Sequence, residues 1–433
     1  MVIYSQAFPR INIKKNKVLK VIQPRISKLS FAMLTALSLT ACNESTSVSQ
    51  GSDFGGSTPP PTTEFNEAAM VAALTDNVIT PTYQQFTQSA ESQYEAVQSY
   101  CQAEKDFNQS TATAAERDQA QLQARDSWKS AMDNWQQVEV MQLGPLLEQD
   151  GTLRNKIYSW PIANSCAVDL DVTFFAEGTV NGEPYDITKR TSSRKGLLAL
   201  EYLLFNDNLD HSCTGSTVPE GWNGTLDSER REMRCEFAQE VAFDIVTNAN
   251  DLNSRWSGDN GFAAQLKNAG TENSDITSEH AAVNLISDAM FYVDTGTKDG
   301  KLAIPVGILA NSCGTSACPE DVESKFADYS LPNISQNLIA FEKLLTGDTG
   351  LGFTDFLIDE GDQETADAMT TAITTAKANV GAADSTLKEL LSSNPEAVEA
   401  MHGDVKAITD KLKVDFITTL ALELPKTSAG DND

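Results

Sequence analysis

The chain contains few histidines and none of the short motifs that mark common hydrolytic sites. Its 433 residues hold three His, at positions 211, 280 and 402, and none belongs to a His-Glu-x-x-His zinc motif. We expect all three at the surface or at helix ends. A zinc peptidase normally uses three protein ligands and a base, and the sequence does not visibly supply them. Gly-x-Ser-x-Gly is absent as well, which excludes a serine hydrolase built on that turn.

Basic residues are also scarce, because 32 Lys and Arg stand against 61 Asp and Glu. Seven of the basic residues and none of the acidic ones lie in the first 41 positions. The remainder therefore carries 25 basic against 61 acidic residues, a formal net charge of −36. Such a chain repels phosphate, so we expect no nucleic-acid partner. The acidity favours solubility and concentrates cations locally, but it identifies no function.

The first 42 residues have the composition of a secretory signal. A basic stretch precedes an apolar run from Leu29 to Ala41, which is shorter than the roughly 20 residues that a membrane-spanning helix needs. The run ends in Leu-Thr-Ala-Cys42, which resembles the lipobox of bacterial lipoproteins. This resemblance implies lipidation of Cys42, with palmitate as an attached chain, and membrane contact through the lipid anchor only.

The residues after Cys42 indicate where the lipoprotein is anchored and how its domain is attached. Asn43 is not the Asp associated with inner-membrane retention, so we expect an outer-membrane lipoprotein of the cell envelope that faces the periplasm or the cell surface. Residues 43–66 are rich in Ser, Thr, Gly and Pro and contain few large apolar side chains. They predict a flexible tether between the lipid and a folded domain.

With Cys42 assigned to lipid, six cysteines remain, and six can pair completely. Fifteen pairings exist, so the choice among them is a hypothesis. No Cys-x-x-Cys occurs, which disfavours a cysteine metal site. The pairs that we predict from the loops they would close are Cys101 with Cys166, Cys213 with Cys235, and Cys313 with Cys318.

Helical periodicity dominates residues 67–425, which we expect to form one domain with helical halves at about 67–245 and 246–425. A capping box at Thr113 starts a long helix that should end at Gly144-Pro145. Asn394, followed by Pro, marks another start. Only residues 168–188 favour a hairpin, and residues 426–433 should be a disordered tail. Further helices are expected at about 82–105, 228–256, 279–294, 334–346 and 363–379.

The segment from Gly196 to Phe205 is apolar on nearly every face, which is typical of a helix surrounded by other helices. Its one charged residue is Glu201. A buried carboxylate costs several kcal/mol unless it is hydrogen-bonded, paired or bound to a cation. Glu201 therefore needs a partner, and the candidates are a ligand or one of three arginines. These are Arg154, Arg190 and Arg194.

This segment contains a motif that resembles the motif of a known family. Gly196-x-Leu198-x-x-Glu201 is similar to the Gly-x-His-x-x-Glu motif of imelysin-like proteins, with Leu in the position of the His. Other segments resemble the family in order and spacing. They are Trp135-x-x-x-Glu139, Gly144-Pro145, Arg154 followed by Trp160-Pro161, Leu302 to Gly307, and Asn337 to Gly347.

The resemblance covers about residues 67–425 and implies an all-α protein of two packed helical bundles, with one small hairpin or irregular insertion. It places a site at or near the junction of the bundles. The family includes an insulin-cleaving outer-membrane protein, iron-regulated surface and periplasmic proteins, and relatives of the ferrous-uptake component EfeO. The ligand-binding residues that it implies are Glu139, Arg154, Trp160, Gly196 and Glu201, together with Leu198 at the position that departs from the motif.

The departure at Leu198 bears on function. A His and a Glu three residues apart would share a helical face and could bind one metal, whereas Leu198 offers no ligand atom. Glu139 and Glu201 could meet across packed helices and bind a hard cation such as iron(III) or calcium. Alternatively, Glu201 pairs with Arg154 and the pocket takes an organic or peptide ligand.

We therefore expect a non-catalytic ligand-binding component of iron or other nutrient uptake, with an outer-membrane transporter as its partner. An iron ion is the candidate cofactor. One alternative is a metallopeptidase of the insulin-cleaving type, which depends on the family resemblance more than on residues present in this sequence. Another is a divergent scaffold that binds an organic ligand or a protein partner.

Overall fold

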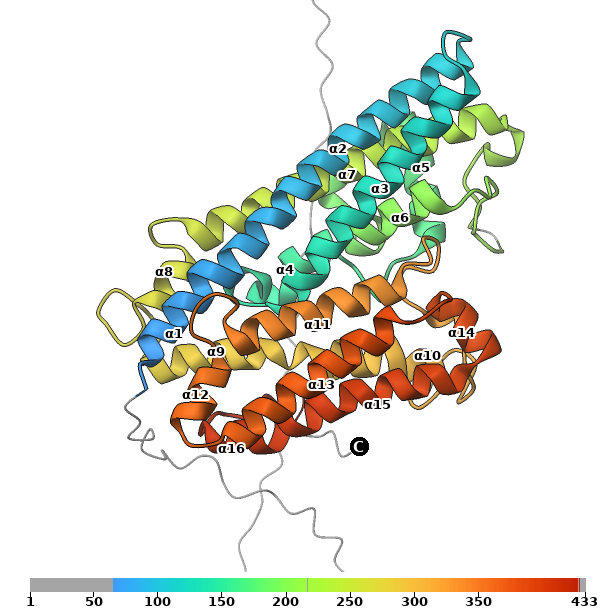
Figure 1. Cartoon of the computed structure of the whole chain (residues 1–433). Helices are drawn as coiled ribbons and strands as arrows, with labels where there is room; N and C mark the ends of the chain where they lie inside the picture. The colour runs from blue at the N-terminus through green and yellow to red at the C-terminus, as the bar shows by residue number, and fades with distance from the viewer. Residues whose placement is uncertain (1–64, 216, 427, 429–433) are drawn as a thin grey trace, which may run out of the picture. The chain divides into compact units, whose positions relative to one another are not determined.

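The computed structural model describes residues 65–215, 217–426 and 428, and they form an almost wholly helical domain (Figure 1). The expected signal peptide, the expected lipidation site Cys42 and the expected tether up to residue 64 lie outside the described residues, as does most of the expected tail at 426–433. Among the described helices, none combines the length and the apolar character needed to cross a membrane.

The first bundle is built on three long helices. These are α2 (Thr80–Asn108), α3 (Ala114–Val140) and α7 (Asp227–Ser257). Helix α2 packs along both α3 and α7 (Figure 1). The capping box at Thr113 is confirmed, since its side chain accepts the backbone N–H of Glu116 while the Glu116 carboxylate accepts the N–H of Thr113. The helix ends at Val140, a few residues before the expected stop.

Shorter helices complete the first bundle. Helix α6 packs against α3 and α7, and α1 leads through a π-helical turn into α2. The expected boundary between residues 245 and 246 is wrong, because α7 runs unbroken through it and stays in contact with first-bundle helices along its length. The remaining helices of this part are α1 (Glu67–Ala73), α4 (Glu148–Ile157), α5 (Ser165–Glu177), α6 (Gly196–Phe205) and α8 (Phe262–Lys267).

The second bundle centres on α11 (Ser330–Thr346), α13 (Gln363–Gly381) and α15 (Pro395–Lys411), with Asn394 as the N-cap residue of α15. Helix α11 packs against α13 on one side and α3 on the other, so it joins the two bundles (Figure 1). A π-helical segment, Val293–Ala303, packs against α11 and α15. Shorter helices are α9 (Glu279–Met290), α10 (Ile304–Val306), α12 (Phe353–Asp359), α14 (Leu387–Ser393) and α16 (Ile417–Thr419).

The expected hairpin at residues 168–188 is correct only at its turn. Residues 165–177 are helical because Asn164 caps α5, and because Asp169 and Asp171 on its buried face find arginine partners that a strand would not present in the same way. Only β1 (Thr179–Val180) and β2 (Glu183–Pro184) pair, antiparallel around Asn181-Gly182.

The six cysteines in the described part of the chain are all paired, but two of the predicted pairs are wrong. Only Cys313–Cys318 is confirmed, with its Cα atoms 5.6 Å apart. Helices α2 and α7 are neighbours, and this brings Cys101 to Cys235 at a Cα separation of 5.3 Å. Cys166 at the start of α5 pairs with Cys213 at 4.5 Å. The histidine expectation also fails in part, because His402 is buried within α15.

Candidate functional site at the junction of the two bundles

Helix α6 forms as expected and its start requires glycine. Gly196 has φ +79°, and a Cβ at this position would lie 2.6 Å from the carbonyl oxygen of Ile157. Only glycine combines this backbone conformation with so close an approach to α4. On the following residue, the Leu197 carbonyl accepts a hydrogen bond from the Trp128 indole at 2.9 Å. Both contacts fix the helix that carries Leu198 and Glu201.

Glu201 is 1% exposed and is bound by backbone amides rather than by an arginine. Its Oε1 accepts the N–H of Phe326 at 2.9 Å and the N–H of Ala327 at 3.0 Å. The expected arginine partners are wrong for a simple reason, since each is engaged elsewhere. Arg190 and Arg194 bind Asp171, and Arg154 donates to the side chain of Gln142.

The segment that binds Glu201 has an unusual backbone. Ser324 and Asp328 adopt φ values of +50° and +52°, which L-residues rarely do. Between them, the amides of Phe326 and Ala327 both point at one carboxylate oxygen, as in the anion-binding nests formed by successive N–H groups. Burial nevertheless dominates the electrostatics and raises the pKa of Glu201 to about 8, with the two amides opposing it.

A cavity of about 480 Å³ lies beside Glu201. Leu198, the residue in the motif's His position, also lines it and is 8% exposed. The walls come from α5 and α6 of the first bundle and from the π-helical segment, α10 and residues 320–326 of the second. The cavity therefore lies between the two bundles, where the family resemblance led us to expect a site. Its other principal lining residues are Trp160, Val168, Tyr202, Gly300, Ile304, Glu320, Asp321, Val322, Ser324, Lys325 and Phe326.

A buried polar network lies directly behind this cavity and is centred on Lys301. The Lys301 ammonium lies 3.2 Å from Oε2 of Glu139 and 3.2 Å from Oε1 of Glu323, and it donates to Oδ1 of Asn337 at 2.8 Å. It also donates to the Gln136 side chain. Glu323 accepts further hydrogen bonds from Tyr158 and from Asn333. Two carboxylates therefore share one ammonium in a region closed to water.

Glu139 and Glu201, the expected metal pair, lie in different surroundings. Glu139 faces Lys301, and burial raises its pKa despite that ammonium, with Glu323 adding to the increase. Glu323 also raises the pKa of Glu201, so it couples the two electrostatically. In the described part of the chain, no group of three or more His, Cys, Asp and Glu is arranged to hold a metal ion. Ligation by Glu139 and Glu201 stays a prediction, and it would require Lys301 to leave Glu139.

Trp160 lies at the cavity as expected, whereas Arg154 is not among the lining residues. The Lys301 ammonium is 5.8 Å from the centroid of the Trp160 ring. A Cβ on Gly300 would lie 2.5 Å from the edge of that ring, so glycine is needed there for the indole to pack. Trp160 thus separates the open cavity from the buried network.

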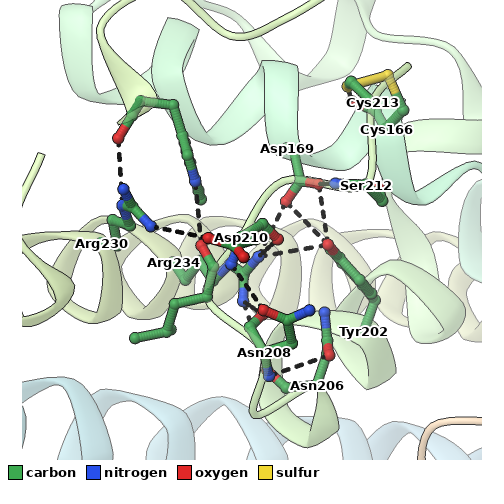
Figure 2. Close-up of polar contacts among 12 residues, drawn as sticks. Cys166, Asp169, Tyr202, Asn206, Asn208, Asp210, Ser212, Cys213, Arg230 and Arg234 are labelled. Atoms are coloured by element: carbon green, nitrogen blue, oxygen red, sulfur yellow. Dashed lines mark hydrogen bonds and ion pairs between the residues drawn. A yellow bond between two sulfur atoms is a disulfide. The ribbon is translucent and has the colours of Figure 1, made fainter. Parts of the chain in front are cut away.

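A second polar network anchors the other side of α6 (Figure 2). Asp169 accepts hydrogen bonds from the Tyr202 hydroxyl and from both the backbone N–H and the hydroxyl of Ser212. The Arg234 guanidinium lies 3.3 Å from the same carboxylate. Figure 2 shows the side chains of Asp169, Tyr202, Ser212 and Arg234 converging close to the Cys166–Cys213 disulfide. They come from α5, α6, the loop after α6, and α7. Tyr202 lines the cavity, so this network positions the wall next to Glu201.

Comparison with known proteins now decides the family. The family model described as Peptidase_M75: Imelysin matches residues 79–414. The chain belongs to the imelysin family. It is 27% identical to iron-regulated protein A of Synechococcus elongatus over 217 residues, which are 49% of this chain and 48% of that protein. This imelysin-family chain thus spans about half the length of the curated relative it matches.

Solved structures agree with the imelysin fold. An imelysin-like protein from Psychrobacter arcticum has a TM-score of 0.61 at 15% identity, over 84% of this chain and 99% of its own. An iron-regulated protein A precursor from Parabacteroides distasonis has a TM-score of 0.62 at 16% identity, over 84% of this chain and 97% of its own. At these identities the likeness shows the fold alone.

Proposed function

We propose that this imelysin-family protein is a non-catalytic ligand-binding component of iron-linked nutrient uptake at the cell envelope. The cavity at the bundle junction carries the proposal. It is of ligand-binding size, and the two side-chain-bearing residues of the family motif, Leu198 and Glu201, both line it. Likeness to two proteins named as iron-regulated supports the link to iron.

Placement in the envelope has independent support. Three disulfides are typical of an oxidising compartment outside the cytoplasm. The lipobox ending at Cys42 supports an outer-membrane lipoprotein, and a tethered binding domain would act next to a transporter in that membrane. An outer-membrane transporter is accordingly the partner that we propose.

The alternative is a metallopeptidase, which the description of the family favours. The residues at the cavity support it less well. Leu198 cannot bind zinc. The carboxylates of the buried network, Glu139 and Glu323, face the Lys301 ammonium rather than an imidazole. Cleavage of insulin B chain by the purified protein, abolished by a chelator and restored by zinc, would establish the alternative and reject a purely binding role.

Iron uptake by living cells tests the proposal. We expect deletion of the gene to lower accumulation of radioactive iron under iron limitation, and the wild-type chain to restore it. Ser165→Trp should not restore uptake, because a large ring on this cavity-lining residue would fill the binding space. Gln363→Trp is the matched control, an exposed first residue of α13 outside the cavity, and should restore uptake. Unchanged uptake in the deletion strain, or full rescue by Ser165→Trp, would reject the proposal.

A further inference from the structure

The charges that line the cavity are not balanced. Four charged side chains line it, and three of them are carboxylates. Glu320 has cationic neighbours, since its two oxygens lie 3.8 Å from the Lys325 ammonium and 3.5 Å from that of Lys388. Lys325, the lysine in the lining, forms its ion pair with Glu320. Its charge also lowers the pKa of Glu201, but it lies within ion-pair distance of neither Glu201 nor Asp321.

Those two carboxylates are held only by neutral donors. Glu201 accepts two backbone amides through Oε1. Asp321 accepts the backbone N–H and the hydroxyl of Ser312, both at 2.7 Å. Neither forms an ion pair within 4.0 Å among the residues that the structure describes. Neutral donors hold a carboxylate in place but do not cancel its charge. Asp321, together with Glu201 once the pH rises through its raised pKa of about 8, therefore gives the cavity a negative potential that favours a cation.

The rest of the lining indicates what kind of cation fits. Trp160, Leu198, Ile304, Val322 and Phe326 give the cavity large apolar and aromatic walls. A bare metal ion would leave those walls and most of the roughly 480 Å³ without contacts, whereas an organic body would fill them. Aromatic faces also attract organic cations directly. The lining thus combines recognition of a positive charge with recognition of an apolar group.

We propose that the cavity binds an organic cation, an ammonium or guanidinium group on an apolar body, with the charge directed at Glu201 and Asp321. This inference rests on the proposed function, because it assumes that the cavity is the ligand site. It names the ligand's chemical class. A ferric chelate of net positive charge with an organic shell belongs to that class, and so does a basic side chain of a peptide.

Two probes of nearly equal shape test the class. Titration calorimetry of the mature chain would compare 2-phenylethylguanidinium with the neutral urea of the same skeleton, at pH 8.5, where Glu201 is mostly ionised because its pKa is about 8. We expect the guanidinium to bind at least about tenfold more tightly. Equal affinity for the urea, or no binding of either probe, would overturn the inference.

Variants locate the charge that is recognised. Asp321→Asn should weaken guanidinium binding about tenfold and leave urea binding unchanged. Asp321 is half-buried, so we expect the variant to fold. Glu201→Gln should act in the same direction. Asp384→Asn removes an acidic charge that lines a different cavity and should change neither affinity. If Asp321→Asn and Asp384→Asn behave alike, the cation does not sit where we place it.

The outcomes separate this inference from the proposed function. If the guanidinium probe does not bind but Ser165→Trp still abolishes iron uptake, the ligand class is rejected and the uptake role is kept. If the guanidinium probe binds tightly but the deletion strain takes up iron normally, the ligand class is kept and the uptake role is rejected.

Discussion

The Lys301 ammonium lies 3.2 Å from Oε1 of Glu323, and this ion pair connects the π-helical segment with the residues that bind Glu201. Both side chains are fully buried. Glu139 shares the same ammonium from α3 of the first bundle. A single lysine thus forms ion pairs with carboxylates from both bundles in the buried network beside the cavity.

Lys301→Met should therefore destabilise the protein strongly. The substitution keeps the volume but leaves Glu139 and Glu323 buried without their cation, and breaking a buried pair in this way costs about 3 to 5 kcal/mol. Urea denaturation would measure the loss in the free energy of unfolding. Adding Glu139→Gln and Glu323→Gln to Lys301→Met should recover much of it. A loss below roughly 1 kcal/mol in the single variant would show that Lys301 does not hold the junction together.

Gly196→Ala should disrupt the start of α6. Gly178 is the matched control, because its φ of +71° is close to the +79° of Gly196 but its added Cβ would meet nothing within 4 Å. Gly178→Ala should cost about 1 kcal/mol from backbone strain alone. Gly196→Ala should cost roughly 2 kcal/mol more, because its Cβ also meets the Ile157 carbonyl. Equal losses in thermal or urea unfolding would contradict the close contact between α4 and α6.

The fold was largely predictable because its signals are local. Caps such as Thr113 and apolar periodicity depend on residues three or four positions apart, and they placed most helices within a few residues. The errors arose where distant partners decide. Asp169 and Asp171 of α5 are buried because they pair with arginines outside that helix, and Cys101 finds Cys235 because α2 and α7 pack together.

The candidate site was only half predictable for the same reason. The motif identified Leu198 and Glu201, which both line the cavity. Nothing in the sequence pattern singled out Lys301 or Glu323, since a charged residue beside Gly300 or in the stretch 320–325 reads as an exposed loop residue. Their burial depends on packing between segments more than one hundred residues from α3, which periodicity within either segment does not report.

His280 should make stability depend on pH. Its Nδ1 lies 2.6 Å from the Glu67 carboxylate at the start of α1, and its Nε2 lies 3.2 Å from the Ala421 carbonyl near the C-terminus. The hydrogen bond with Glu67 is the main cause that raises the pKa of His280 above its ordinary 6.5. A raised pKa means that the folded state binds the proton more tightly than the unfolded state.

The resulting stabilisation is fully present below about pH 6.5 and is lost as the pH rises through the higher pKa of the folded protein. The difference in unfolding free energy between wild type and His280→Gln should therefore shrink from pH 5.5 to pH 8.5. A difference that stays constant over this range would mean that His280 does not change protonation on folding. NMR titration of the imidazole would give its pKa directly.

Lipidation of Cys42 predicts a clear change in fractionation. Cys42→Ser should abolish incorporation of labelled palmitate and move the chain from the membrane pellet to the soluble fraction, because it removes the sulfur that would carry the lipid. Cys313→Ser, which removes a different cysteine, is the control and should leave the chain in the pellet. Membrane retention of the Cys42→Ser variant would reject the lipid anchor.

Removing the disulfides should destabilise the protein in the order of the loops they close. Cys101–Cys235 spans 134 residues, whereas Cys313–Cys318 spans five. On loop-closure entropy, replacing both cysteines by Ala should cost about 5 kcal/mol for the first pair and about 2 kcal/mol for the second. Urea denaturation of the two double variants would compare them. Equal losses of unfolding free energy in the two double variants would contradict this order. They would show that the unfolded chain is already compact around Cys101 and Cys235.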